Sequence, residues 1–274
     1  MNKRMKISVT DKRAEKDTQL HLLRSKLELT KETKAIQKEI EKNPSSTELW
    51  MKKGLELAKQ MHFREAIEAY SIGLSHNPFH ALTLRHRGHR LISTYRFEEA
   101  TFDFELSSRL DPSNWDTWYH LGLAYYLIGD FERANNAYSR CLDMTKEDQE
   151  ELVAIVDWKW LTLMRLGKIE EAKEVLQLVN EKTEPGENTV YKERVLMYKG
   201  KIKPENILEN IPGYEGDGFG DFELATQGYG VSMFFYFNGE KEKAFDLFRR
   251  ILQHDTFWSA FGFIAAYQDE KRLN

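Results

Sequence analysis

Cysteine is almost absent from this 274-residue sequence, which has one, Cys141. A single cysteine excludes an intramolecular disulfide and any metal site built from several thiolates. We expect Cys141 to be buried as a small apolar side chain. Proline is also scarce, with six residues, while 31% of the residues are charged. This composition fits a helical protein better than a sandwich or a barrel.

Long apolar runs are missing as well. No uncharged run approaches the ~18 residues of a membrane span. The amino-terminal stretch MNKRMKISVTDKRAEKD is basic but lacks the apolar region of a secretion signal. We therefore expect a cytoplasmic protein that binds no membrane. Residues 1–43 hold a surplus of Lys and Arg, so the rest of the chain is acidic. An acidic body argues against a nucleic-acid binder, whose affinity comes from a basic surface.

A repeat of 34 residues organises the middle of the sequence. Its third copy contains Trp118, Leu121, Gly122, Tyr125, Ala134 and Tyr138; the second contains Leu84, Arg87, Gly88, Leu91, Ala100 and Phe104; the first contains Trp50, Lys53, Gly54, Leu57, Ala66 and Tyr70. The first four positions recur at i, i+3, i+4 and i+7, which is one face of a helix. Residues 47–80, 81–114 and 115–148 therefore each predict a helical hairpin.

Less regular units follow. A fourth hairpin comes after a slip of four residues and contains Val156, Trp160, Leu163, Gly167, Ala172 and Leu176. The predicted organisation is a disordered basic tail (1–17), an N-terminal helical cap (18–46), four repeat units (47–184), a degenerate helical pair with a Gly-rich loop (185–223), and a late unit with a capping helix (224–274). For 18–46, a partner-binding or dimerising helix stays open as an alternative. The acidic loop 211–223 lacks the spacing of a calcium or phosphate loop, so a linker or partner contact is the better interpretation.

The pattern carried by Trp118, Gly122, Tyr125 and Ala134 and its counterparts resembles the tetratricopeptide repeat over roughly residues 47–268. More weakly, the order of units resembles the bacterial new-lipoprotein-I group of repeat adaptors, which are envelope lipoproteins. Their signal peptide and lipid-acceptor cysteine are not found here, so anchoring does not carry over. The resemblance implies an all-α, right-handed solenoid of helical hairpins. It also implies that a peptide or a helical segment of another protein binds in a concave groove lined by the first helix of each hairpin.

In such a fold, first-helix side chains not used for packing face the groove. They recur at i, i+4 and i+7, and the predicted peptide-binding residues are Arg85, His89 and Ile92, then Tyr119, Leu123 and Tyr126, then Asp157, Leu161 and Met164. Arg85, His86, Arg87, His89 and Arg90 would make its entrance positive. Such a groove favours a ligand with apolar anchors and some acid. The family's clamp for chaperone tails is missing, because Met51, Leu55, Asp116 and His120 occupy its positions.

The sequence offers little sign of chemistry. His86 and His89 have a spacing that suits a metal, but the arginines around them would repel a cation, so we expect no metal and no cofactor. Two hypotheses remain. The first is a non-catalytic scaffold or adaptor for protein–protein interaction. The second is an enzyme, or the specificity subunit of one, that uses the irregular segment 185–223. We favour the first; the identity of the partner and the oligomeric state, including a homodimer, stay open.

Overall fold

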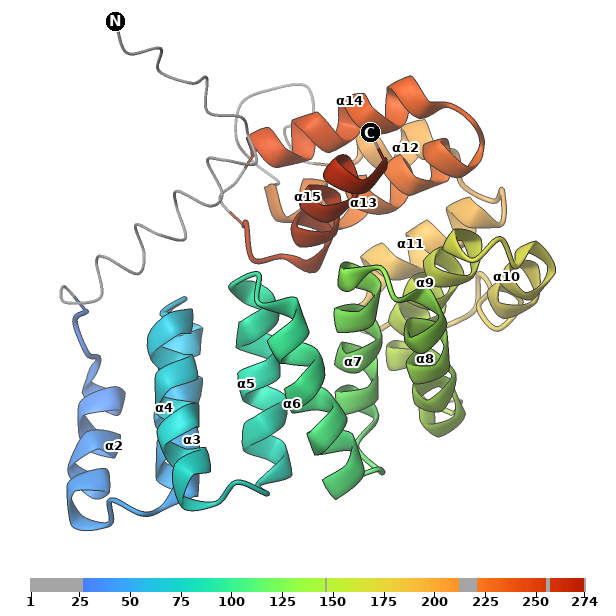
Figure 1. The fold of residues 1–274 in the computed structure, drawn as a ribbon. Coiled ribbons are helices and arrows are strands. Elements are labelled where there is room, and N and C mark those ends of the chain that lie inside the picture. Colours follow the sequence, from blue (N-terminus) through green and yellow to red (C-terminus); the bar gives the residue numbers. More distant parts are fainter. Residues whose placement is uncertain (1–26, 146, 212–220, 255–256, 274) are drawn as a thin grey trace, which may run out of the picture. The chain divides into compact units, whose positions relative to one another are not determined.

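The computed structural model describes residues 27–145, 147–211, 221–254 and 257–273. These residues form helices α2 to α15, with no strand among them (Figure 1). The prediction of an all-α fold is confirmed. Two compact units divide the chain in sequence between Ile128 and Gly129. The predicted basic tail 1–17 and the first part of the predicted cap, residues 18–26, lie outside the described residues.

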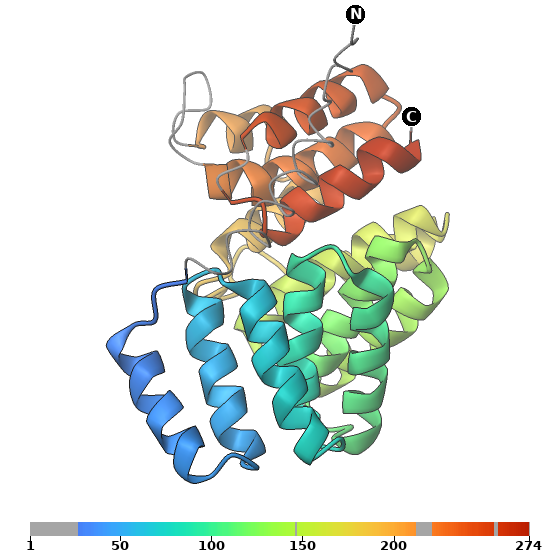
Figure 2. The same ribbon diagram turned by 60° about the vertical axis from the view of Figure 1, so that its left-hand side comes forward.

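The N-terminal unit, residues 27–128, consists of stacked helical hairpins (Figure 2). Its helices are α2 (Lys31–Lys42), α3 (Thr47–Lys59), α4 (Phe63–His76), α5 (Ala81–Ser93), α6 (Phe97–Leu110) and α7 (Trp115–Ile128). Helices α3 and α4 form the first predicted hairpin, and α5 and α6 form the second. Helix α7 packs on α6 and also touches α5, while α2 packs on α3 and buries Ile40 against it.

Side-chain caps start the first helix of each repeat. Ser46, His80 and Asn114 accept hydrogen bonds from the backbone N–H groups three residues further on, at 3.3, 3.3 and 3.0 Å. Asp148 does the same for the first helix of the fourth repeat, at 3.4 Å. A cap satisfies an amide that has no partner inside the helix. The caps follow the 34-residue period, so the repeat also dictates where these helices begin.

The turns inside the hairpins share a left-handed backbone conformation. Gly129, Gly167 and Gly239 have φ values of 87°, 71° and 84°. The same turn position holds Met61 and Tyr95 in the first two repeats, both with φ of 62°. Only glycine adopts this region without steric cost. The first two turns therefore store backbone strain that the later ones avoid.

Small residues let the two helices of a hairpin approach closely. A Cβ on Gly54 would collide with the Tyr70 ring, and one on Gly88 would lie 2.9 Å from the Phe104 ring. Tyr70 and Phe104 are both buried. The conserved spacing of glycine and aromatic residue within each repeat is thus a packing requirement.

The C-terminal unit continues from Gly129. Its helices are α8 (Phe131–Thr145), α9 (Gln149–Arg165), α10 (Ile169–Leu176), α11 (Thr189–Tyr198), α12 (Pro204–Glu209), α13 (Asp221–Phe237), α14 (Lys241–Gln253) and α15 (Phe261–Leu273). Helices α9 and α10 pair as the predicted fourth hairpin, and α13 and α14 pair as the late one. The four-residue slip lies inside α9, which has 17 residues against 13 in α5.

The irregular helices and the last helix are fastened to this unit by packing and by ion pairs. Helices α11 and α12 both pack against α13. In α15, Asp269 accepts hydrogen bonds from Arg165 of α9 and from the Tyr229 hydroxyl of α13, each at 2.8 Å. The Asp269 side chain is 1% exposed. The sequence interpretation placed this residue in a solvated charged tail, and that is corrected here: Asp269 is buried because it faces Arg165.

Candidate functional site

A polar cluster joins the first helices of two successive repeats in the N-terminal unit. Arg85 of α5 forms an ion pair with Asp116 of α7. Asp116 also accepts from His120, whose Nδ1 lies 3.2 Å from its carboxylate and 2.8 Å from its backbone carbonyl. The His120 ring lies 4.5 Å from that of His89. Arg85, His89, Asp116 and His120 therefore occupy one surface, which we call the first-helix face.

Burial and neighbouring charge set the protonation of this cluster. Burial, with help from Arg85, lowers the pKa of His86 to about 4. Burial, followed by the charge of Arg90, holds the pKa of His89 well below its usual value. Burial alone would raise the pKa of Asp116, but its interactions with His120 and Arg85 hold it well below the usual range. At neutral pH His86 and His89 are therefore uncharged and Asp116 is ionised.

The predicted residues of the N-terminal unit are partly brought together by this cluster. Arg85 and His89 keep some exposed surface, whereas Tyr119 is 8% exposed and packs edge-on against the His120 ring. Ile92, Leu123 and Tyr126 are buried. Contact of these six side chains with a ligand stays a prediction.

The predicted residues of the C-terminal unit have other surroundings. Asp157 is fully buried and forms an ion pair of 2.7 Å with Arg194 of α11, which is equally buried. Burial raises the pKa of Asp157 to about 6, against the lowering effect of Arg194. Leu161 is buried and Met164 is partly exposed. The Asp157 carboxylate thus ties α9 to α11, and a role of these three residues in ligand binding stays a prediction.

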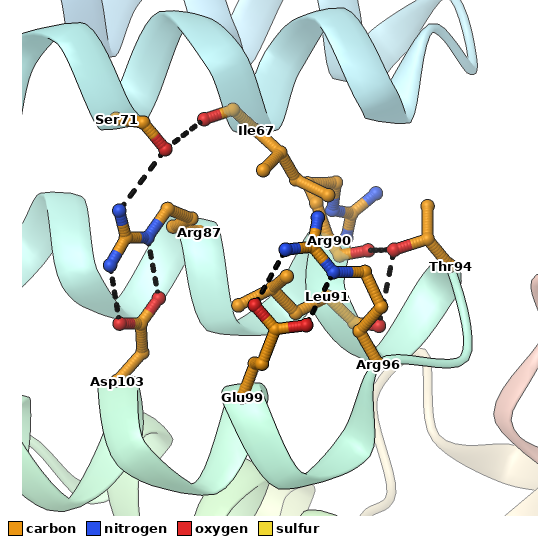
Figure 3. A network of polar contacts seen from close by, with 9 residues as sticks. All are labelled: Ile67, Ser71, Arg87, Arg90, Leu91, Thr94, Arg96, Glu99 and Asp103. Carbon is orange, nitrogen blue, oxygen red and sulfur yellow. Dashed lines mark hydrogen bonds and ion pairs between the residues drawn. The ribbon is translucent and has the colours of Figure 1, made fainter. Parts of the chain in front are cut away.

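Arg87, expected at the positive entrance, lies on another side of α5. It makes two hydrogen bonds of 2.7 Å to the Asp103 carboxylate and one of 3.1 Å to the Ser71 hydroxyl (Figure 3). These residues line a cavity of about 210 Å³ between α4, α5 and α6. The expectation for Arg87 is wrong because a helix turns its side by about 100° per residue, so Arg85 and Arg87 point in different directions.

Sequence reasoning missed the pairing of Arg85 with Asp116. Asp116 lies in the first turn of the next repeat's first helix, one helical turn before the position equivalent to Arg85. An acid at that offset from an arginine is a usable signal, because neighbouring first helices run side by side. The pairing makes the entrance less positive than its arginines alone indicate.

Metal and membrane features are not seen in the part of the chain that the structure describes. Among these residues no group of three or more His, Cys, Asp and Glu side chains is arranged to hold a metal ion. No helix among them is both long and apolar enough to cross a membrane. Cys141 is fully buried, as expected.

Comparisons with known proteins agree on the repeat. Residues 116–148 match the family model of the tetratricopeptide repeat. A tetratricopeptide-repeat protein from Parabacteroides merdae superposes with a TM-score of 0.57 at 15% identity, covering 95% of this chain and 98% of that one. YrrB, described as a TPR protein with an unusual peptide-binding site, superposes with a TM-score of 0.50 at 17% identity, covering 83% and 96%.

One curated relative also matches in sequence. It is the heat-shock protein cognate co-chaperone sgt12 of Aspergillus fumigatus, 28% identical over 100 residues. The match covers 36% of this chain and 29% of that protein. These likenesses concern the repeat and the fold.

Proposed function

Because the chain is a tetratricopeptide-repeat protein, we propose that it is a non-catalytic adaptor that binds a segment of another protein on the first-helix face. Stacked helical repeats present extended surfaces that suit such partners. YrrB is described as having a peptide-binding site, and the matching Aspergillus protein is a co-chaperone. Both descriptions concern those proteins, and they support an interaction role here. Fold by itself does not assign a function.

The observation that carries the proposal is the placement of polar side chains across two repeats. In α5, Gly88 and Leu91 are buried in the hairpin with α6. Arg85 and His89 instead reach Asp116 and His120 of α7 and keep some exposed surface. Polar groups that span two hairpins and remain accessible give a ligand several donors and acceptors along one line.

Photo-crosslinking tests which face binds. A benzophenone amino acid replaces Leu55, a partly exposed residue of α3, in one variant. The control variant carries it at Phe102 of α6, which is 68% exposed. We expect crosslinked partner protein in native lysate from the Leu55 position and little from the Phe102 position. Crosslinks of equal yield, or from Phe102 alone, would contradict the proposed face.

A second arm removes contacts within the predicted set. Arg85→Gln combined with Tyr119→Ala should reduce partner capture while the melting curve stays close to that of the wild type. Glutamine is used because a glutamate at this position would face Asp116. Full capture by a folded double variant would exclude these two side chains from the binding surface.

The alternative of a reaction site in 185–223 gains no support from the described residues of that segment. The strongly shifted pKa values there belong to Arg194 and Tyr198, which surround Asp157. Arg194 and Asp157 have no exposed side-chain surface. A substrate therefore has no path to this cluster in the present conformation.

A further inference from the structure

Four arginines lie in α5 or beside it, and three of them meet a carboxylate. Arg87 is held by Asp103, and Arg96 makes hydrogen bonds of 2.7 and 2.6 Å to Glu99 (Figure 3). Arg85 is paired with Asp116. Neutralisation by an acid is thus the rule for the guanidinium groups of this region.

Arg90 is the exception. Within the described residues its guanidinium has no carboxylate and no hydrogen-bond acceptor, and its contact is the Phe63 ring at 4.9 Å. Figure 3 shows dashed lines reaching the side chains of Arg87 and Arg96, while at Arg90 they reach only the backbone oxygen that Thr94 uses. Burial lowers the pKa of Arg90 to about 10, and Tyr70 and Arg85 are the charge partners that modify this value.

The surroundings do not supply the missing negative charge. His86 and His89 on the same helix are neutral at pH 7, as derived above from their lowered pKa values. The acid facing them, Asp116, is already engaged by Arg85 and His120. One positive charge therefore stays without a counter-charge in a partly buried position, which is energetically unfavourable.

We propose that Arg90 receives a carboxylate of the bound protein segment, from an Asp or Glu side chain or from a chain terminus. A charge-assisted hydrogen bond to a guanidinium is among the stronger polar contacts, and it would remove the cost of the unpaired charge. Arg85 adds attraction from nearby, since its charge also acts on Arg90. The inference rests on the proposed function, because it assigns the acidic anchor of that same ligand.

The stability of the free protein distinguishes a binding role from a structural one. Arg90→Gln removes an unpaired charge, so we expect the urea midpoint of the free variant to equal or exceed that of the wild type. The control is Arg96→Gln, which removes the exposed pair with Glu99 and should leave the midpoint nearly unchanged. A clearly lower midpoint for Arg90→Gln than for Arg96→Gln would show that Arg90 holds the fold together and would overturn the proposal.

Binding is measured with a synthetic library of random 12-residue peptides that have free carboxyl termini. The full-length chain captures peptides, and mass spectrometry identifies them. We expect the tightest binders of the wild type to be enriched in Asp and Glu, or to need their terminal carboxylate. Each is then remade with Asn or Gln for the acid, or with an amidated terminus, which tells the two sources apart.

The comparison of paired changes gives the decisive number. Removing the peptide's acid should weaken binding to the wild type and to Arg96→Gln by about 10- to 100-fold, the range for a hydrogen bond to a charged group. The same change should weaken binding to Arg90→Gln less than about threefold. An equal loss on all three proteins, or selected peptides without acid, refutes the role of Arg90 and leaves the proposed function standing. Failure of the wild type to select any peptide contradicts the proposed function itself.

Discussion

The left-handed turn shared by the hairpins makes a prediction whose sign depends on position. At Met61, with φ of 62°, glycine should give a more stable protein than alanine. An L-residue in this region costs roughly 1–2 kcal/mol. Glycine loses more chain entropy on folding, which offsets roughly 0.5–1 kcal/mol of that. The expected difference is therefore about 1 kcal/mol in favour of glycine.

Comparing Met61→Gly with Met61→Ala isolates the backbone, because both variants lose the same methionine contacts. Gly167 gives the reverse test: a Cβ there meets no atom within 4 Å, so Gly167→Ala pays only the backbone cost. Lys52, exposed within α3, is the matched helical control. There alanine should be more stable than glycine by about 1 kcal/mol.

Urea unfolding followed by circular dichroism measures the difference. With an m-value of about 3 kcal/mol/M, 1 kcal/mol moves the midpoint by about 0.3 M. The glycine variant at position 61 should unfold at the higher urea concentration, and the glycine variant at position 52 at the lower one. If alanine equals or exceeds glycine at position 61, the turn is not strained and the argument fails.

Three further predictions concern packing and charge. Gly54→Ala should destabilise the N-terminal unit by about 1–3 kcal/mol, since its methyl group would overlap the Tyr70 ring; thermal melting against wild type checks this, and an unchanged melt would contradict the close approach. The lowered pKa of His86 means that the unfolded chain binds more protons between pH 6.5 and about 4, so stability should fall as pH drops through that window; His86→Asn should flatten the dependence by about 1–2 kcal/mol in urea midpoints taken at pH 4.5 and 7, and an identical slope would refute it. Asp269→Asn should weaken the attachment of α15 by leaving Arg165 less neutralised, seen as faster amide hydrogen exchange in α15 and none in α3.

The sequence predicted the hairpins well because the repeat encodes them locally. Glycine, alanine and aromatic positions fix the helix contact inside each repeat, and Gly54 with Tyr70 shows the physical reason. The caps at Ser46, His80 and Asn114 keep the same period. Helix and turn positions were therefore readable from spacing alone.

Side-chain pairing between elements was less predictable. Asp157 has the position of a ligand-facing residue, yet Arg194 of α11 is aimed at it in the fold. Their meeting depends on how α11 packs against α9, which follows no repeat. The same limit applies to Arg87 and Asp103, whose contact depends on which side of α5 turns toward α6. Local periodicity specifies a face, and tertiary packing then decides what that face touches.

The distribution of tryptophan gives each unit its own optical reporter. Trp50, Trp115 and Trp118 belong to the N-terminal unit and are all partly exposed. The indoles of Trp50 and Trp118 donate to the carbonyls of Pro44 and Pro112. In the C-terminal unit Trp158, Trp160 and Trp258 are all buried. Loss of the C-terminal unit should therefore shift fluorescence emission strongly to the red, while loss of the N-terminal unit shifts it little, so one emission spectrum recorded during unfolding separates the two events without a label.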